Sequence, residues 1–76
     1  MSPAQILALT YIGYHREGDV TTMMAKVKAG CPEGWSATYT VGCRSPAPGA
    51  ILVGGLAGTH HDDDFHIWVV HNHAET

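Results

Sequence analysis

Strict alternation of apolar and polar residues is the clearest pattern in the chain, and it covers residues 35–43. The apolar positions are Trp35, Ala37, Tyr39, Val41 and Cys43, and the polar positions are Ser36, Thr38, Thr40 and Gly42. A period of two predicts an antiparallel strand with one buried face and one exposed face. The stretch AILVGG at 50–55 is apolar on both faces and predicts a central strand, and FHIWVVHNH at 65–73 predicts the last strand.

The first element begins with a helix-start signal. In SPAQ, Ser2 is a capping residue, Pro3 suits the first helical position, and Gln5 completes a capping box. These residues predict a helix over 3–16. The stretch TYIGY at 10–14 is rich in strand-forming residues, so the first element is either a helix or a strand.

A second helix is predicted over residues 20–29. Asp19 is a good N-cap residue, and apolar side chains follow at helical spacing: Val20, Met23, Met24 and Val27. Gly30 and Pro32 then predict the end of the helix.

Together these elements predict a single α+β domain over residues 1–76, a three-stranded antiparallel meander packed on one or two N-terminal helices. A domain of this size buries only about 60% of its unfolded surface. Such domains often gain stability from a metal, a disulfide or self-association. Cys31 and Cys43 would suffice for one disulfide, but the sequence does not decide whether they pair.

Charge and hydropathy exclude two classes of partner. The formal net charge is −3 with only four basic residues, whereas nucleic-acid binding requires a basic patch. We therefore expect no nucleic-acid partner. The chain also lacks an apolar run of the roughly 20 residues that a membrane span needs. It has no basic segment before its first apolar stretch, so we expect a cytoplasmic protein.

Histidines gather near the end of the sequence and suggest a metal site. Alternation places His71 and His73 on one side of the last strand, roughly 6.5–7 Å apart. The candidate ligands of zinc or another divalent transition metal are His60, His61, Asp62, His71 and His73. Such a site would store metal or activate water for hydrolysis. The alternative is that these polar residues form a solvated turn and strand end, and that no cofactor is bound.

Aromatic residues exceed what a thin core easily buries. Trp68 points away from Phe65 on the last strand, so a sheet covered on one side leaves one of them outside. The candidate interface residues are Trp68, His66, Tyr39, Trp35 and Tyr14, together with the polar loop 57–64. The alternative is that helices cover both sides of the sheet.

Low charge, surplus aromatic residues and the absence of a complete catalytic set favour a small non-enzymatic protein that binds another protein. Enzymatic activity stays open through the metal alternative. Stoichiometric inhibitors and adaptors from phages or mobile elements, anti-CRISPR proteins among them, are similar in size and composition. The expected partner is a protein, with a homodimer as one possibility.

Overall fold

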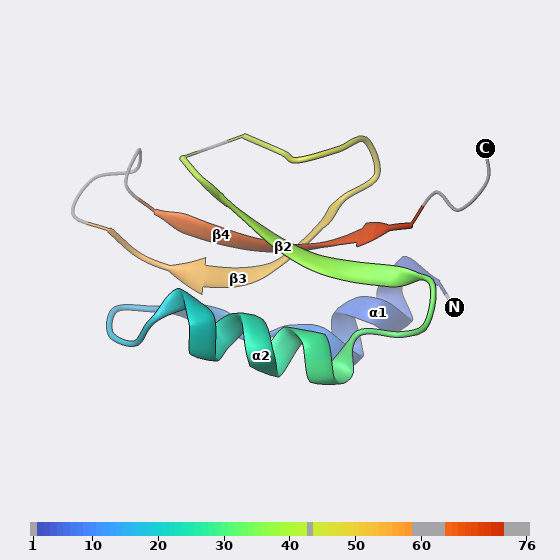
Figure 1. The fold of residues 1–76 in the computed structure, drawn as a ribbon, viewed down its shortest axis with the longest axis horizontal. Helices are drawn as coiled ribbons and strands as arrows, with labels where there is room; N and C mark the ends of the chain where they lie inside the picture. Colours follow the sequence, from blue (N-terminus) through green and yellow to red (C-terminus); the bar gives the residue numbers. More distant parts are fainter. Residues whose placement is uncertain (1, 43, 59–63, 73–76) are drawn as a thin grey trace.

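The computed structural model describes residues 2–42, 44–58 and 64–72 as two helices on one face of a four-stranded sheet (Figure 1). The elements in chain order are α1 (Pro3–Thr10), β1 (Gly13–His15), α2 (Val20–Gly30), β2 (Trp35–Val41), β3 (Ile51–Leu56) and β4 (Phe65–His71). This arrangement confirms a small α+β domain. Neither helix in the described residues is long and apolar enough to cross a membrane.

The first element is divided between the two expected structures. The capping box forms as predicted, because the Gln5 N–H donates to Ser2 Oγ at 3.2 Å and the Ser2 N–H donates to Gln5 Oε1 at 2.7 Å. The helix ends at Thr10, however, and the next residues become strand β1. The sequence changes there from helix-forming residues to strand-forming residues, and the C-cap Tyr11 is already extended, with φ −66° and ψ 122°.

Helix α2 matches its expected bounds closely. Its N-cap Asp19 accepts the backbone N–H of Thr22 at 2.8 Å and the Thr22 hydroxyl at 2.9 Å. Met23 and Val27 are buried against the sheet. The helix includes Gly30 as its last residue, and a Cβ there would lie 3.1 Å from the Leu9 carbonyl oxygen, so Gly30 permits close contact with the end of α1.

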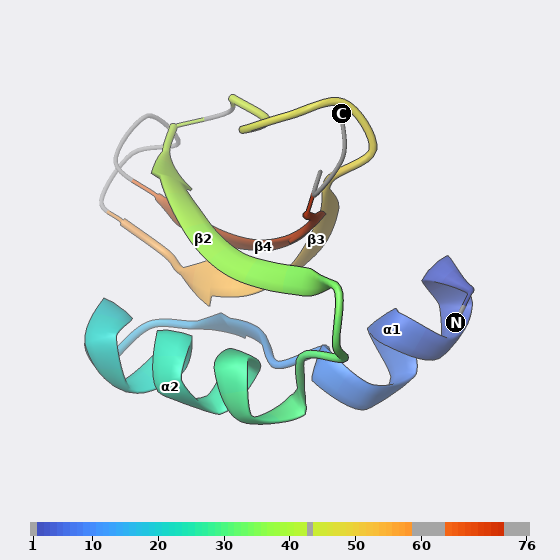
Figure 2. The ribbon, with the colours of Figure 1, turned by 45° about the vertical axis from the view of Figure 1, so that its right-hand side comes forward.

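The predicted three-stranded meander is wrong. The strand order is β1-β3-β4-β2, with β1 parallel to β3 and with β4 antiparallel to both of its neighbours. Strands β2 and β3 are consecutive in sequence, yet β4 lies between them. Residues 44–50, in the connection between β2 and β3, cross the sheet on the face opposite the helices (Figure 2). The central position suits β4 because its Ile67 and Val69 are fully buried, whereas half of β2 is polar.

The core lies between the helices and the sheet. Its buried members are Ile6, Met23, Val27, Val53, Ile67 and Val69. Strand β3 is central, as expected, and approaches β1 closely: a Cβ on Gly54 would overlap the carbonyl oxygen of Gly13. The expected buried face of β2 is only partly covered, because β2 is an edge strand whose Tyr39 and Val41 are 46% and 53% exposed.

Candidate protein-binding surface

The outer face is the side of the sheet that the helices do not cover (Figure 2). Strand register brings residues from all four strands together there. Trp68 lies opposite Thr38 and Leu52, and His66 lies opposite Thr40 and Gly55. Tyr14 pairs with Gly55 on its other side. We call Tyr14, Leu52, His66 and Trp68 the outer-face cluster.

Hydrogen bonds fix the rings of the outer-face cluster. The Tyr14 hydroxyl is hydrogen-bonded to His66 Nδ1, and the Trp68 indole N–H donates to Thr40 Oγ1 at 2.8 Å. The Tyr14 and His66 rings meet edge to face at 5.5 Å between centroids, and the His66 and Trp68 centroids are 6.5 Å apart. The aromatic side chains of this cluster are therefore held in place before any partner arrives.

Gly55 provides the space for this contact. Tyr14 and His66 lie on either side of Gly55, and a Cβ on Gly55 would lie 3.0 Å from Tyr14 Cε2. The other ring nitrogen of His66, Nε2, is buried and has no hydrogen-bond partner in the part of the chain that the structure describes. The glycine thus allows the tyrosine to reach across β3 to the histidine on β4.

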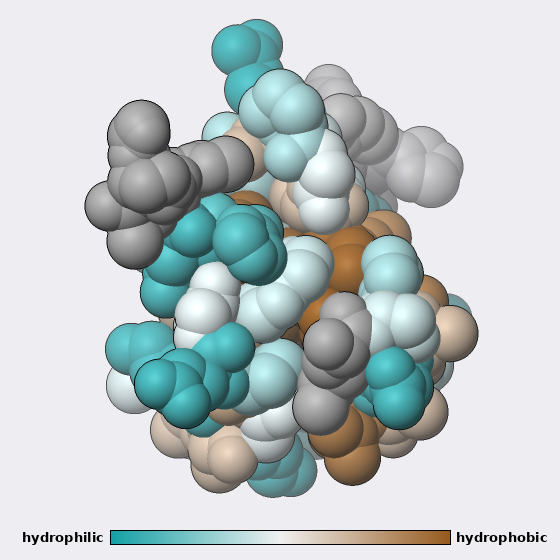
Figure 3. Space-filling model, turned by 90° about the vertical axis from the view of Figure 1, so that its right-hand side faces the viewer, coloured by the Kyte–Doolittle hydropathy of each residue, from teal (hydrophilic) through white to brown (hydrophobic). Residues whose placement is uncertain are grey.

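The described strand residues of the outer face combine partial exposure with an absence of Asp, Glu, Lys and Arg, whereas the 44–50 connection that crosses this side of the sheet includes the exposed Arg44. Tyr14 is 42% exposed and Leu52 is 37% exposed, while His66 and Trp68 are half-buried. Figure 3 views a different surface, the end of the domain that carries the N-terminus, where apolar atoms reach the surface in the middle of the view among polar residues. The partly exposed, uncharged strand residues of the outer face suit contact with another protein better than contact with a charged ligand.

The five predicted interface residues do not share one surface. Tyr14, His66 and Trp68 lie together on the outer face. Tyr39 lies on the helix side at the β2 edge, where its ring meets Phe65 edge to face at 5.7 Å. Trp35 is half-buried on the same side, near the other end of β2, against the His71 ring at 5.0 Å. Trp68 and Phe65 do point to opposite sides of β4, as the alternation predicts.

The predicted metal site falls mainly outside the described residues. This applies to His60, His61, Asp62 and His73, while His71 lies exposed beside Trp35. The described ranges contain no group of three histidine, cysteine, aspartate or glutamate side chains that could hold a metal ion. The metal site therefore stays a prediction.

The predicted loop 57–64 is described only at its two ends. Asp64 joins these ends, because its carboxylate accepts the Gly58 N–H at 2.7 Å. The backbone carbonyl of Asp64 also accepts the Gly42 N–H at 3.0 Å, which links the loop end to the end of β2. Asp64 therefore has a structural role at the rim of the sheet.

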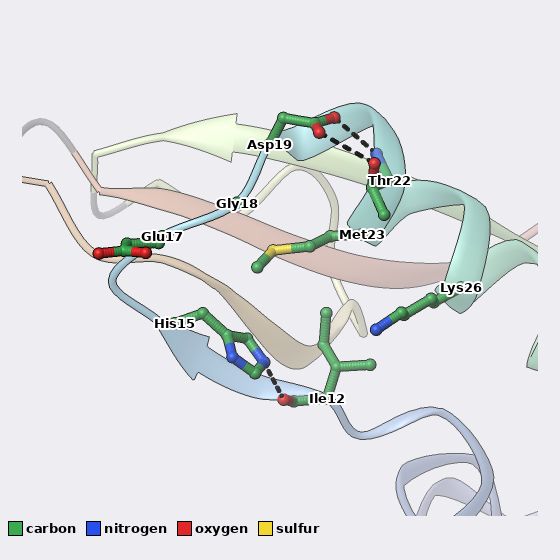
Figure 4. A pocket seen from close by; sticks show the side chains of 8 residues that line it. All are labelled: Ile12, His15, Glu17, Gly18, Asp19, Thr22, Met23 and Lys26. Carbon is green, nitrogen blue, oxygen red and sulfur yellow. Dashed lines mark hydrogen bonds between the residues drawn. The ribbon is translucent and has the colours of Figure 1, made fainter.

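A pocket of about 400 Å³ between β1 and α2 was not predicted from the sequence (Figure 4). Its polar lining includes His15, Glu17, Asp19 and Lys26. Two of these groups serve the local fold: His15 Nε2 bonds to the Ile12 carbonyl at 2.8 Å, and Asp19 caps α2. The lining residues come from a strand, a connection and a helix, so no single sequence motif identifies them.

Cys31 is a free, half-buried thiol at the end of α2, and burial raises its pKa above the ordinary value. A raised pKa leaves less of the reactive thiolate at neutral pH. Cys43, its expected disulfide partner, lies outside the described residues.

The chain has no match among models of known protein families, among curated proteins or among solved structures. The arrangement of its own side chains is therefore the ground for a functional proposal, and its main feature is a hydrogen-bonded aromatic cluster on one face of the sheet.

Proposed function

We propose that the chain is a small non-enzymatic binding domain that docks onto a protein partner through its outer face. The observation that carries the proposal is the outer-face cluster itself, in which the Tyr14–His66 and Trp68–Thr40 hydrogen bonds hold partly exposed rings among uncharged strand residues. Tyrosine and tryptophan are the residues that most often dominate the binding energy of protein interfaces.

Prior ordering of the cluster supports binding as its role. Side chains that are already fixed lose little conformational freedom when a partner covers them, so more of the contact energy appears as affinity. The partly exposed Leu52 lies directly opposite Trp68 and adds an aliphatic side chain to the rings. A stoichiometric inhibitor or an adaptor, of the kind that phages encode as anti-CRISPR proteins, requires no more than such a surface.

The test compares two variants with the same substitution on different surfaces. Leu52→Arg places a charge in the outer-face cluster, and Leu9→Arg places one on α1, where Leu9 is 61% exposed. The two variants and the unchanged protein are coupled to three separate resins. Each resin is used to capture proteins from the cells that encode the chain. Quantitative mass spectrometry compares the captured proteins, and circular dichroism verifies folding.

The proposal expects a partner that is retained by the unchanged protein and by Leu9→Arg and is lost with Leu52→Arg. With the purified partner, Leu52→Arg should raise the dissociation constant by roughly tenfold or more. Loss of the partner with both variants, or with neither, would contradict docking through the outer face.

A further inference from the structure

Strand β2 is an edge strand with one side unpaired. In the described residues its only strand neighbour is β4, which it pairs with over its whole length from Trp35 opposite His71 to Val41 opposite Phe65. An unpaired edge offers a row of backbone N–H and C=O groups that another strand can bond.

The hydrogen-bond pattern shows which groups face this free edge. The Asn72 N–H donates to the Gly34 carbonyl at 2.8 Å, and the Gly42 N–H donates to the Asp64 carbonyl at 3.0 Å. Both pairs continue the β2–β4 register. The backbone N–H and C=O groups of even-numbered β2 residues therefore bond to β4, and those of odd-numbered residues face the free edge. The outward residues are Trp35, Ala37, Tyr39 and Val41. The Trp35 N–H is already used, because it donates to the Pro32 carbonyl at 3.1 Å.

The free edge carries none of the features that normally prevent strand addition. Proteins protect exposed edges with charges, prolines, bulges or very short strands. The sequence of β2, WSATYTV, has no charge and no proline, and its register with β4 is unbroken over seven residues. The opposite edge of the sheet is protected, because β1 has only three residues and is followed directly by Arg16 and Glu17.

We propose that a second copy of the chain adds to this edge, with antiparallel β2 strands related by a two-fold axis at Thr38. In this register the backbone N–H and C=O groups of Ala37 in one copy bond to those of Tyr39 in the other copy. Val41 faces Trp35 of the second copy, and its N–H reaches the one backbone group that Trp35 has free, the carbonyl. The edge is therefore complementary to itself in its backbone groups.

The side chains of the proposed dimer also match. On the outer side, Thr38 faces Thr38 of the second copy, and threonine pairs are favourable cross-strand neighbours. On the helix side, exposed Val41 meets the Trp35 ring of the second copy, and β-branched residues pair well with aromatic residues. An uncharged strand pairing with itself places no like charges opposite each other, which favours a second copy over a partner with a charged strand.

The flank of α2 extends the proposed contact surface. A pocket of about 360 Å³ lies between α2 and Tyr39 at this edge and is lined by Val20, Thr21, Met24, Ala25, Lys28 and Tyr39. Helix α2 runs antiparallel to β2 (Figure 1). The two-fold axis therefore turns the end of one α2 that carries Asp19 toward the end of the other that carries Lys28. Opposite charges and apolar side chains would then approach across the interface.

This dimer goes beyond the proposed function and does not depend on it, because the edge and the outer-face cluster are different surfaces.

The first test is disulfide trapping in a chain that carries Cys31→Ala and Cys43→Ala. Thr38→Cys places two cysteines at a non-hydrogen-bonded pair, where Cα atoms are about 4.5 Å apart and a disulfide can form. Ser36→Cys is the matched control, because its two copies would be roughly 13 Å apart along the strands.

The result expected is a covalent dimer of Thr38→Cys on a non-reducing gel, together with a mass of twice 8.1 kDa for the unchanged protein in light scattering. Ser36→Cys should remain uncrosslinked. A monomer for the unchanged protein at all concentrations would overturn the proposal, as would equal crosslinking of both cysteine variants.

A charge pair provides the second test. Thr38→Lys and Thr38→Glu each place like charges opposite each other, so each variant alone should dissociate with a constant raised by roughly tenfold or more. A mixture of the two should recover the dimer, which a variant that simply misfolds cannot do. Ala8→Lys, on the exposed side of α1, is the control and should dimerise normally. A dimer unaffected by either Thr38 charge would place the interface elsewhere and overturn the proposal.

Discussion

The indole N–H of Trp68 on β4 donates to the hydroxyl oxygen of Thr40 on β2 across 2.8 Å. The bond is diagonal, because the residue directly opposite Trp68 is Thr38. The bond is also partly buried, so little water is available to hydrogen-bond to the indole N–H or to the hydroxyl if the other partner is removed. One hydrogen bond thus fixes both the orientation of the largest outer-face ring and the position of β2 relative to β4.

Replacing Thr40 with valine should destabilise the domain by about 1–2 kcal/mol. Valine preserves the shape of the side chain but leaves the partly buried indole N–H without its acceptor. Urea unfolding followed by tryptophan fluorescence measures the change. Thr40→Ser keeps the hydroxyl and should cost clearly less than Thr40→Val; equal costs for the two variants would show that the bond is not stabilising.

Replacing Gly55 with alanine should destabilise the domain by about 3 kcal/mol or more, enough to unfold much of the population. A Cβ at Gly55 would overlap the carbonyl oxygen of Phe65, a backbone atom of the central strand β4, and would press on the Tyr14 ring. Gly49→Ala is the control, because that site has a φ of 81° but no atom within 4 Å of an added Cβ. It should cost only about 1–2 kcal/mol of backbone strain. Thermal unfolding of both variants checks the difference, and a Gly55→Ala protein as stable as Gly49→Ala would contradict the close approach.

Acidification should weaken the domain through Asp19. The pKa of this carboxyl is below its ordinary value because the Thr22 backbone N–H, and then the Thr22 hydroxyl, donate to the ionised group. In the unfolded chain the pKa returns to its ordinary value. The stabilisation is therefore complete above that ordinary value and is lost as the pH falls through the lowered pKa of the folded state.

Urea midpoints measured from neutral pH down to about pH 3 test this dependence on Asp19. The unchanged protein should lose more stability over this range than Asp19→Asn, whose amide oxygen still caps α2 but does not titrate. Identical pH dependence in the two proteins would show that Asp19 does not contribute.

The Cys31 thiol should react slowly with iodoacetamide in the folded protein. Burial raises its pKa, so the thiolate fraction at neutral pH is lower than that of an exposed cysteine. In a Cys43→Ser variant we expect alkylation several-fold slower than that of glutathione, and urea should restore the faster rate. Mass spectrometry follows the reaction, and a folded-state rate as fast as that in urea would contradict the burial.

Local signals in the sequence predicted where both helices begin, because the relevant contacts are local, but they did not predict that α1 ends at Thr10 rather than near residue 16. The Ser2 and Gln5 capping box and the Asp19 cap join residues only three positions apart. Alternation also predicted correctly that Trp68 and Phe65 point to opposite sides of their strand. Each of these predictions depended on neighbours along the chain.

Strand order could not be predicted in the same way because it depends on which strands bury their faces most completely. The short strand β1 has only three residues and is stabilised by parallel pairing with Gly54 to Leu56, far away in sequence. The close approach at Gly54 and Gly55 had a visible signal, since glycines inside a strand often permit near contact. The separation of Tyr39 and Trp35 from the outer-face cluster follows from register between strands, which no single segment reveals.

The central place of β4 also has a consequence for how the protein is made. Strands β2 and β3 both pair with β4, which follows them in sequence, so neither has its main partner while the ribosome is still adding Phe65–His71. A nascent chain that ends before β4 would leave β2 without its strand partner and β3 paired only with β1, so both strands would be open to other nascent chains. The sheet therefore closes only after β4 has left the exit tunnel, and an arrest inserted before Phe65 should yield a species that chaperones hold or proteases remove.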